Sequence, residues 1–144
     1  MTLKQIEPLA SAAIEQLAID ASPDEFKDPQ FAFLNEALAE ELNLSQCDAS
    51  FFAAQDIPEN TKAIAQAYAG HQFGNFNPML GDGRAHIIGD VVDANQQMFE
   101  FGFKGSGATP FSRGGDGKAA LGPMLREVLI SEAMHALGIA TTRS

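Results

Sequence analysis

Apolar residues in the first part of the chain recur at steps of three and four positions, which is the spacing of a helix with one buried face. Three such stripes predict helices over residues 3–17, 30–42 and 61–68. Pro29 lies near the start of the second helix, where a missing N–H costs nothing. The residues expected to face inward are Leu3, Ile6, Leu9, Ala10, Ala13, Ile14 and Leu17 in the first helix, Phe33, Leu34, Ala37, Leu38 and Leu42 in the second, and Ala63, Ile64 and Ala67 in the third.

The pattern changes from helical to strand-like after residue 85. Residues 86–92 are apolar and β-branched, residues 93–95 have turn chemistry, and residues 97–104 alternate strictly. This order predicts a β-hairpin. The second strand has Phe99, Phe101 and Phe103 on one face and Met98, Glu100, Gly102 and Lys104 on the other.

A final helix is predicted over residues 123–137, and Gly138 is its expected stop signal. Its apolar stripe consists of Met124, Leu125, Val128, Leu129, Ala136 and Leu137. Helices followed by a hairpin and one further helix indicate the α+β fold class.

Charge and glycine content divide the chain at similar positions. The net charge is −10, and residues 1–60 account for it, since they contain twelve acidic residues against Lys4 and Lys27. All 13 glycines lie at or beyond Gly70. We therefore expect an acidic helical segment over residues 1–60 and a glycine-rich domain over residues 61–144. An acidic leader does not favour nucleic acid, whose backbone binds clusters of Lys and Arg.

The composition, 45% hydrophobic and 19% charged, is that of a soluble protein. No apolar run approaches the roughly 18 residues of a membrane span, so no membrane partner is expected. The first residues lack the basic and then apolar layout of a secretory signal. Cys47 is the one cysteine, which rules out an internal disulfide and favours the cytoplasm as the location.

Two glycine-rich turns and a lysine carry the candidate chemistry. The turns over residues 81–84 and 105–107 contain glycines, whose missing Cβ atoms let backbone N–H groups approach an anion. Single turns of this kind more often only connect the strands of a hairpin. Lys104, at a strand end, can contact phosphate oxygens when a carboxylate holds it, and Glu127 on the final helix is the candidate partner. From composition alone, a solvated lysine and a surface glutamate explain both residues equally well.

Other catalytic groupings are not found in the sequence. His71, His86 and His135 are too scattered for a metal site, and no cysteine pair accompanies them, so zinc is not expected. The serines lack a neighbouring His and Asp of the hydrolase kind. The Walker A string is absent. His71 is therefore interpreted as a structural hydrogen-bonding residue and not as a general base.

Five strings, over residues 68–74, 80–85, 101–118, 126–134 and 137–143, resemble the selenoprotein O (SelO) family. The match is dense in the second half of the chain and loose in the first. The resemblance implies a protein-kinase-like fold, in which an antiparallel sheet and a packed αC-like helix form the N-lobe. It also implies transfer of AMP, not phosphate, from ATP to Ser, Thr or Tyr hydroxyls of proteins.

The resemblance also assigns roles to residues of this chain. It implies that ATP contacts Gly81, Gly83, Arg84, Lys104, Asp116 and Gly117, and that Glu127 forms an ion pair with Lys104. The alternation of the strand independently places Gly102 on the face of Lys104, where its missing side chain would leave room for a nucleotide. Asp116 is explained either by a flipped nucleotide, whose base and ribose it would meet, or as an ordinary turn residue. Lys118 and Ala108 stand where the family more usually has arginine, which alters the expected charge of the loop.

A kinase-like enzyme needs two lobes, and a chain of 144 residues supplies one. The resemblance implies that the catalytic Asp and the Mg²⁺ ligands lie downstream of residue 144, so no catalytic or metal-binding residue is expected within this chain. We predict the ATP-binding half-site of a Mg²⁺-dependent protein adenylyltransferase, inactive alone, with ATP and hydroxyl-bearing proteins as partners. The alternatives are an inactive pseudokinase-like fragment or binding module, and a phosphotransferase. Apolar surface left by a missing lobe favours self-association.

Overall fold

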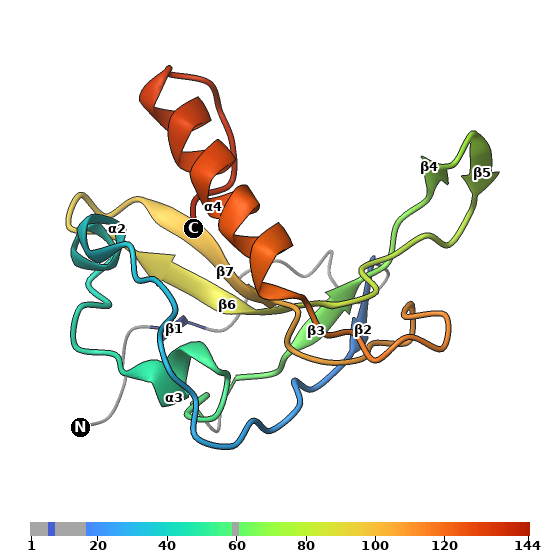
Figure 1. Cartoon of the computed structure of the whole chain (residues 1–144), viewed down its shortest axis with the longest axis horizontal. Coiled ribbons are helices and arrows are strands. Elements are labelled where there is room, and N and C mark those ends of the chain that lie inside the picture. The colour runs from blue at the N-terminus through green and yellow to red at the C-terminus, as the bar shows by residue number, and fades with distance from the viewer. Residues whose placement is uncertain (1–5, 8–16, 59–60) are drawn as a thin grey trace.

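The computed structural model describes residues 6–7, 17–58 and 61–144 and has an α+β fold built on an antiparallel sheet (Figure 1). The strands are β1 (Ile6–Glu7), β2 (Ala18–Asp20), β3 (Ile64–Gln66), β4 (Gly70–Gln72), β5 (Asn75–Asn77), β6 (Ala85–Val92) and β7 (Met98–Lys104). The helices are α2 (Glu36–Glu41), α3 (Ala49–Phe52) and α4 (Leu121–Ala136). No described helix is long and apolar enough to cross a membrane.

Strand β6 is the centre of the main sheet. It pairs along its length with β7, and its other edge pairs with β1 near Val91 and with β3 at Ile87. Strand β2 extends the sheet by pairing with β3. Strands from both sides of residue 60 therefore share one sheet, and the division of the chain into segments 1–60 and 61–144 stays a prediction.

The predicted hairpin is confirmed by β6 and β7. Asp93 closes its turn, because its carboxylate accepts hydrogen bonds from the N–H groups of Asn95 and Gln97, each at 2.8 Å. The pairing register shifts between Ile87 and Gly89, as at a β-bulge, which increases the local twist of the strand.

The apolar face of β7 packs against the segment that contains α2 and α3. The buried cluster there consists of Ala39, Leu44, Phe51, Ile88, Val91 and Phe103. Phe51 stacks on Phe101 with ring centroids 5.7 Å apart, and its edge meets Phe103 at 6.3 Å. Phe99, Phe101 and Phe103 thus share the inward face, as their alternation predicts, and the acidic part of the chain supplies half of the core.

Two helix predictions in the first part of the chain are wrong in extent. Residues 6–7 of the helix predicted over 3–17 form strand β1, and the rest of that prediction up to residue 16 lies outside the described residues. Of residues 30–42, only 36–41 are helical, because Asn35 is the N-cap and its side chain accepts a hydrogen bond from Leu38 N at 3.2 Å. Phe33 precedes the cap and is exposed.

The helix predicted over residues 61–68 is wrong, since residues 64–66 form β3. Partner strands on both sides satisfy its backbone, and Ala65 is fully buried between them, so tertiary pairing overrides a weak helical pattern. The sequence reading also missed α3 and the β4–β5 hairpin. Helix α3 is a single turn that begins at Asp48, which is too short for apolar periodicity to reveal.

The final helix is confirmed with slightly different bounds, and the chain turns at Gly138, whose φ is +72°. Two of the six residues of its predicted apolar stripe face inward. Met124 and Val128 are half-buried and Ser131 is buried, whereas Leu125, Leu129, Ala136 and Leu137 are exposed. In Figure 1 the C-terminal half of α4 projects beyond the sheet. Direct packing on the sheet therefore fixes α4 only near its start.

We expect Phe51→Ala to lower the free energy of unfolding by about 3–5 kcal/mol, because Phe51 is 1% exposed and contacts three other aromatic rings. Urea unfolding of the variant and of the parent measures the difference. Phe73→Ala is the matched control, since Phe73 is 94% exposed and its removal should change stability by less than about 0.5 kcal/mol. Equal losses in both variants would show that Phe51 is not a core residue.

Candidate functional site

The turn over residues 105–107 joins the glycine-rich segments of the chain. The N–H of Gly105 donates to the carbonyl of Arg84 at 2.7 Å, and the N–H of Gly107 donates to the carbonyl of Gly117 at 3.4 Å. One bond leads to the segment before β6 and the other to the loop before α4. The turn is therefore a junction of three segments that are separated in the sequence.

The segment before β6 is held by side chains from the loop after the junction. Gly81 is buried beneath the ring of Phe111, and the hydroxyl of Ser112 donates to the carbonyl of Gly83 at 2.6 Å. Arg84, the last residue of this turn, is exposed. Its backbone is fixed while its guanidinium faces solvent, which suits a group that binds an anion.

Asp82 fixes the same turn through two further hydrogen bonds. Its carboxylate accepts a hydrogen bond from the Tyr68 hydroxyl at 2.7 Å, and its carbonyl accepts one from the Thr109 hydroxyl at 2.5 Å. The bond to the carboxylate raises the pKa of Tyr68 to about 12. The phenol therefore keeps its proton, and the bond, at every physiological pH.

Lys104 and Glu127 form an ion pair, with Nζ and Oε2 2.6 Å apart. The side chains are 49% and 48% exposed, so the pair contributes only about 0–1 kcal/mol to stability. Lys104 is the register partner of Ala85, so it lies at the same end of the hairpin as Arg84. Two cationic side chains thus stand beside the junction, and their role in binding a nucleotide stays a prediction.

Asp116 and Gly117 belong to the third segment of the junction. Asp116 is exposed, and its carboxylate accepts a hydrogen bond from the N–H of Lys118 at 3.0 Å, which is the geometry of a turn residue. Gly117 is buried, and a Cβ there would overlap the carbonyl oxygen of Gly107. The side chain of Asp116 still has one carboxylate oxygen to offer a ligand.

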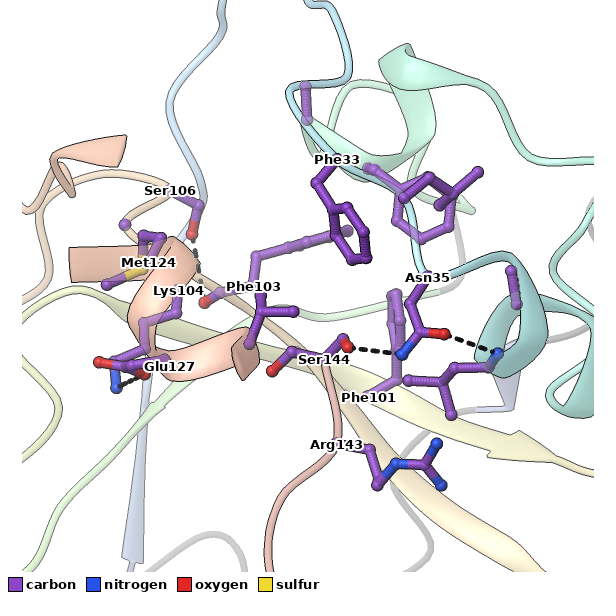
Figure 2. A pocket seen from close by; sticks show the side chains of 18 of the residues that line it. Phe33, Asn35, Phe101, Phe103, Lys104, Ser106, Met124, Glu127, Arg143 and Ser144 are labelled. Carbon is purple, nitrogen blue, oxygen red and sulfur yellow. Dashed lines mark hydrogen bonds and ion pairs between the residues drawn. The ribbon is translucent and has the colours of Figure 1, made fainter. Parts of the chain in front are cut away.

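A cavity of about 870 Å³ lies beside the junction, between α4, β7 and the segment around α2. Figure 2 shows Lys104 and Glu127 at one end and Asn35 bonded to Ser144 at the other. Apolar side chains form most of the wall between them, including Phe33. Of the residues expected to contact ATP, only Lys104 lines this cavity.

Gly102 also lines the cavity. The packing of the paired strand, without any ligand, explains why this residue is glycine. A Cβ at Gly102 would lie 2.8 Å from the carbonyl oxygen of His86 on the paired strand. The interpretation that Gly102 leaves room for a nucleotide is therefore incomplete, since the approach of β6 at its irregular register already requires glycine.

The second half of α4 is tied at Glu132 by a polar cluster that sequence reasoning did not identify. Arg143 makes paired hydrogen bonds to the carboxylate of Glu132 at 2.8 and 2.9 Å and lies 3.6 Å from Glu41. Asn35 donates to the carbonyl of Ser144 at 2.9 Å. The cluster connects α4 to α2 across the cavity, so it fixes the direction of the helix that carries the partner of Lys104.

Among residues 6–7, 17–58 and 61–144, no group of three or more His, Cys, Asp or Glu side chains could hold a metal ion. His71 contacts the ring of Phe76 at 5.3 Å. His86 is a buried residue of β6 and forms a hydrogen bond with Ser106. No spacing in the sequence indicates this contact, because the two residues are 20 positions apart.

Comparison with known proteins identifies the class to which this α+β domain belongs. The family model described as "Protein adenylyltransferase SelO" matches residues 2–144. Curated relatives are named "Protein nucleotidyltransferase YdiU". The relative from Anoxybacillus flavithermus is 56% identical over 128 residues, and that from Chromobacterium violaceum is 57% identical over 122 residues. These matches cover 85% and 81% of this chain and 26% of each relative.

A relative from Mycobacterium sp. strain KMS is 46% identical over 153 residues, which cover the whole of this chain and 31% of the relative. The chain therefore belongs to the SelO family, as the resemblance of its sequence strings implies. It spans between about a quarter and a third of the length of these relatives.

Replacement of Gly117 by alanine should open the junction. Gly117 has a φ of +67°, which a side chain strains, and in addition a Cβ would overlap the carbonyl of Gly107. Gly114 is the matched control, because its φ is +82° but nothing lies within 4 Å of the added Cβ. We expect Gly114→Ala to cost about 1 kcal/mol of stability and Gly117→Ala at least about 2 kcal/mol more. Equal melting temperatures for both variants would contradict the close contact.

The Glu132–Arg143 pair should make stability depend on pH. The hydrogen bonds from Arg143 lower the pKa of Glu132 below its ordinary value of 4.5. The stability that this shift supplies is present above pH 4.5 and is lost as the pH falls through the folded pKa. The destabilisation caused by Glu132→Gln should therefore shrink between pH 6 and pH 3, as measured by urea unfolding. Glu25→Gln, at an exposed position, should match the parent throughout. A deficit for Glu132→Gln that stays constant with pH would refute the linkage.

Proposed function

We propose that this chain supplies the ATP-binding part of a protein adenylyltransferase, which transfers AMP from ATP to Ser, Thr or Tyr hydroxyls of proteins. Membership of the SelO family and the names of the relatives support nucleotidyl transfer. The observation that carries the proposal is the junction, because it gathers Arg84, Lys104 and Gly117 from three glycine-rich segments. Cationic side chains and glycine turns that a ligand can approach closely, concentrated in one place, suit a polyphosphate.

We further propose that the sheet and α4 correspond to the N-lobe of a protein-kinase-like fold, with residues 1–60 as an added acidic segment. Supporting this, a strand ends at Lys104, a glycine-rich loop follows, and a helix then returns Glu127 to the lysine. A kinase N-lobe has the same order of strand lysine and helix glutamate, although its glycine-rich loop precedes that strand.

In this proposal each residue of the junction has a separate task. Lys104, oriented by Glu127, contacts phosphate oxygens, and Arg84 offers a planar fork to the same group. The turns that contain Gly81, Gly83 and Gly117 bring backbone close to the nucleotide, and Asp116 accepts hydrogen bonds from its base or ribose.

The proposed reaction breaks the bond between the α phosphorus of ATP and the oxygen that bridges it to the β phosphorus. The substrate hydroxyl oxygen bonds to the α phosphorus, its proton passes to a base, and pyrophosphate leaves with the electron pair of the broken bond. Cationic groups that face the departing pyrophosphate stabilise the charge that develops on it. Lys104 and Arg84 are the candidates for that task within this chain.

Mg²⁺ is the proposed cofactor, because it neutralises triphosphates in reactions of this class. The described residues do not fit the ion, since they contain no cluster of candidate ligands. We therefore assign no residue of this chain to the metal and derive no step through it.

A second candidate function is that of a non-catalytic, pseudokinase-like binding module. The exposed apolar side chains of α4, among them Leu125, Leu129 and Ile130, favour it, because surface of this kind associates with another chain or with a second copy. Binding without transfer would distinguish this candidate from the enzyme.

Labelled ATP tests the proposed reaction in the native protein that contains this sequence. With Mg²⁺ and acceptor protein present, label at the α phosphate should appear on the protein, and label at the γ phosphate should not. Transfer of the γ label alone would show that the protein is a phosphotransferase and contradict the proposal. Transfer of neither label would favour the binding module.

Variants of two lysines test the site in the same assay. Lys104→Ala should lower transfer of α label by about tenfold or more, because it removes a charge-assisted contact to phosphate. Lys62→Ala is the control, since Lys62 also forms an ion pair at 2.8 Å, with Asp20, but lies outside the junction. Equal activity of the two variants would remove Lys104 from the site.

A further inference from the structure

His86 is a buried histidine to which the proposed reaction gives no task. It belongs to β6, is 0% exposed, and stands opposite Phe103 in the strand register. Its Nδ1 lies 2.7 Å from the hydroxyl oxygen of Ser106, which is also buried. Either tautomer of a neutral ring makes this hydrogen bond, and burial lowers the pKa of His86, which favours the neutral ring.

Ser106 is the middle residue of the junction turn, between two glycines that both have positive φ, +84° for Gly105 and +134° for Gly107. The turn thus has one side chain, and that side chain points inward to His86. Glycine backbone is the most freely moving in a protein, so the anchor of Ser106 restricts the turn more than an ordinary side chain would.

The backbone of the turn depends on that anchor at several points. The carbonyl of Ser106 accepts a hydrogen bond from the N–H of Asp24 at 2.7 Å, while the flanking glycine N–H groups donate to Arg84 and Gly117. Rotation of Ser106 would disturb all three bonds. Lys104 lies two residues before Ser106, so the turn that these bonds hold is adjacent to the lysine.

We infer that His86 is a positioning residue: through Ser106 it holds the turn over residues 105–107 beside Lys104 in the conformation that receives nucleotide phosphates. The ligand named here rests on the proposed function, whereas the effect on the turn does not. A buried polar pair that served only the stability of the core would leave the turn and its ligand affinity unchanged when removed.

Four variants of the native protein separate these roles, with calorimetric titration of ATP in the presence of Mg²⁺ as the first measurement. Ser106→Ala and His86→Leu should each weaken ATP binding by about tenfold. The double variant should bind ATP no more weakly than either single variant, because both changes remove the same interaction. His86→Asn should stay within about twofold of the parent, because the amide can bond to Ser106 from the position of Nδ1.

Ser131→Ala is the matched control, since Ser131 is as buried as Ser106, at 7% exposure, but bonds to a carbonyl within α4. It should not alter ATP affinity. Thermal unfolding of all variants shows which of them remain folded. Unchanged affinity in a folded Ser106→Ala protein, or a loss in His86→Asn equal to that in His86→Leu, would overturn the inference.

Hydrogen exchange at the amides of Gly105 and Gly107 is the second measurement, and it needs no ligand. Exchange should become at least about tenfold faster in Ser106→Ala and His86→Leu and should stay near the parental rate in His86→Asn. If the parent binds no ATP, the proposed function fails, and the exchange rates still decide whether His86 positions the turn. Equal protection in all variants would show that it does not.

Discussion

The hydrogen bond from Gly105 N–H to the carbonyl of Arg84 is the contact on which the candidate site depends. It closes the open end of the β6–β7 hairpin, immediately after the strand pair Ala85–Lys104. Without it the chain after β7 could leave the sheet in any direction. With it, the next residues meet Gly117 and the loop before α4, so one backbone bond brings distant glycine segments together.

Polar contacts, and not apolar packing, set the direction of α4. The helix buries only Ser131 completely among its described residues, which is little surface for an element of 16 residues. Its ties are the ion pair from Glu127 to Lys104 and the hydrogen bonds from Arg143 to Glu132, five residues further along the helix. Exposed ion pairs are weak, so these ties specify orientation more than they add stability.

The sequence predicted the hairpin, the last helix and the residues of the junction for different reasons. Strict alternation indicates a strand, which is why β7 was found, and β6 was found because its residues are apolar and β-branched and a turn separates the two. The short run at residues 64–66 fits helix and strand equally well, and only the neighbouring strands decide it. The link between His86 and Ser106 could not be found, because a contact over 20 positions depends on how the hairpin end folds.

The abrupt rise in glycine content at residue 70 follows from this junction. Among the described residues, the glycines with positive φ are seven, and Gly81, Gly105, Gly107, Gly114 and Gly117 all belong to the joined segments. Backbone in that conformation favours glycine, and backbone that must approach another carbonyl closely excludes a side chain. The described residues before position 60 contribute strands, two capped helices and core side chains, and they adopt positive φ at Asp28, Asn43 and Ala54 without glycine. The change in composition therefore reflects where backbone segments must approach one another closely, as they do around this junction.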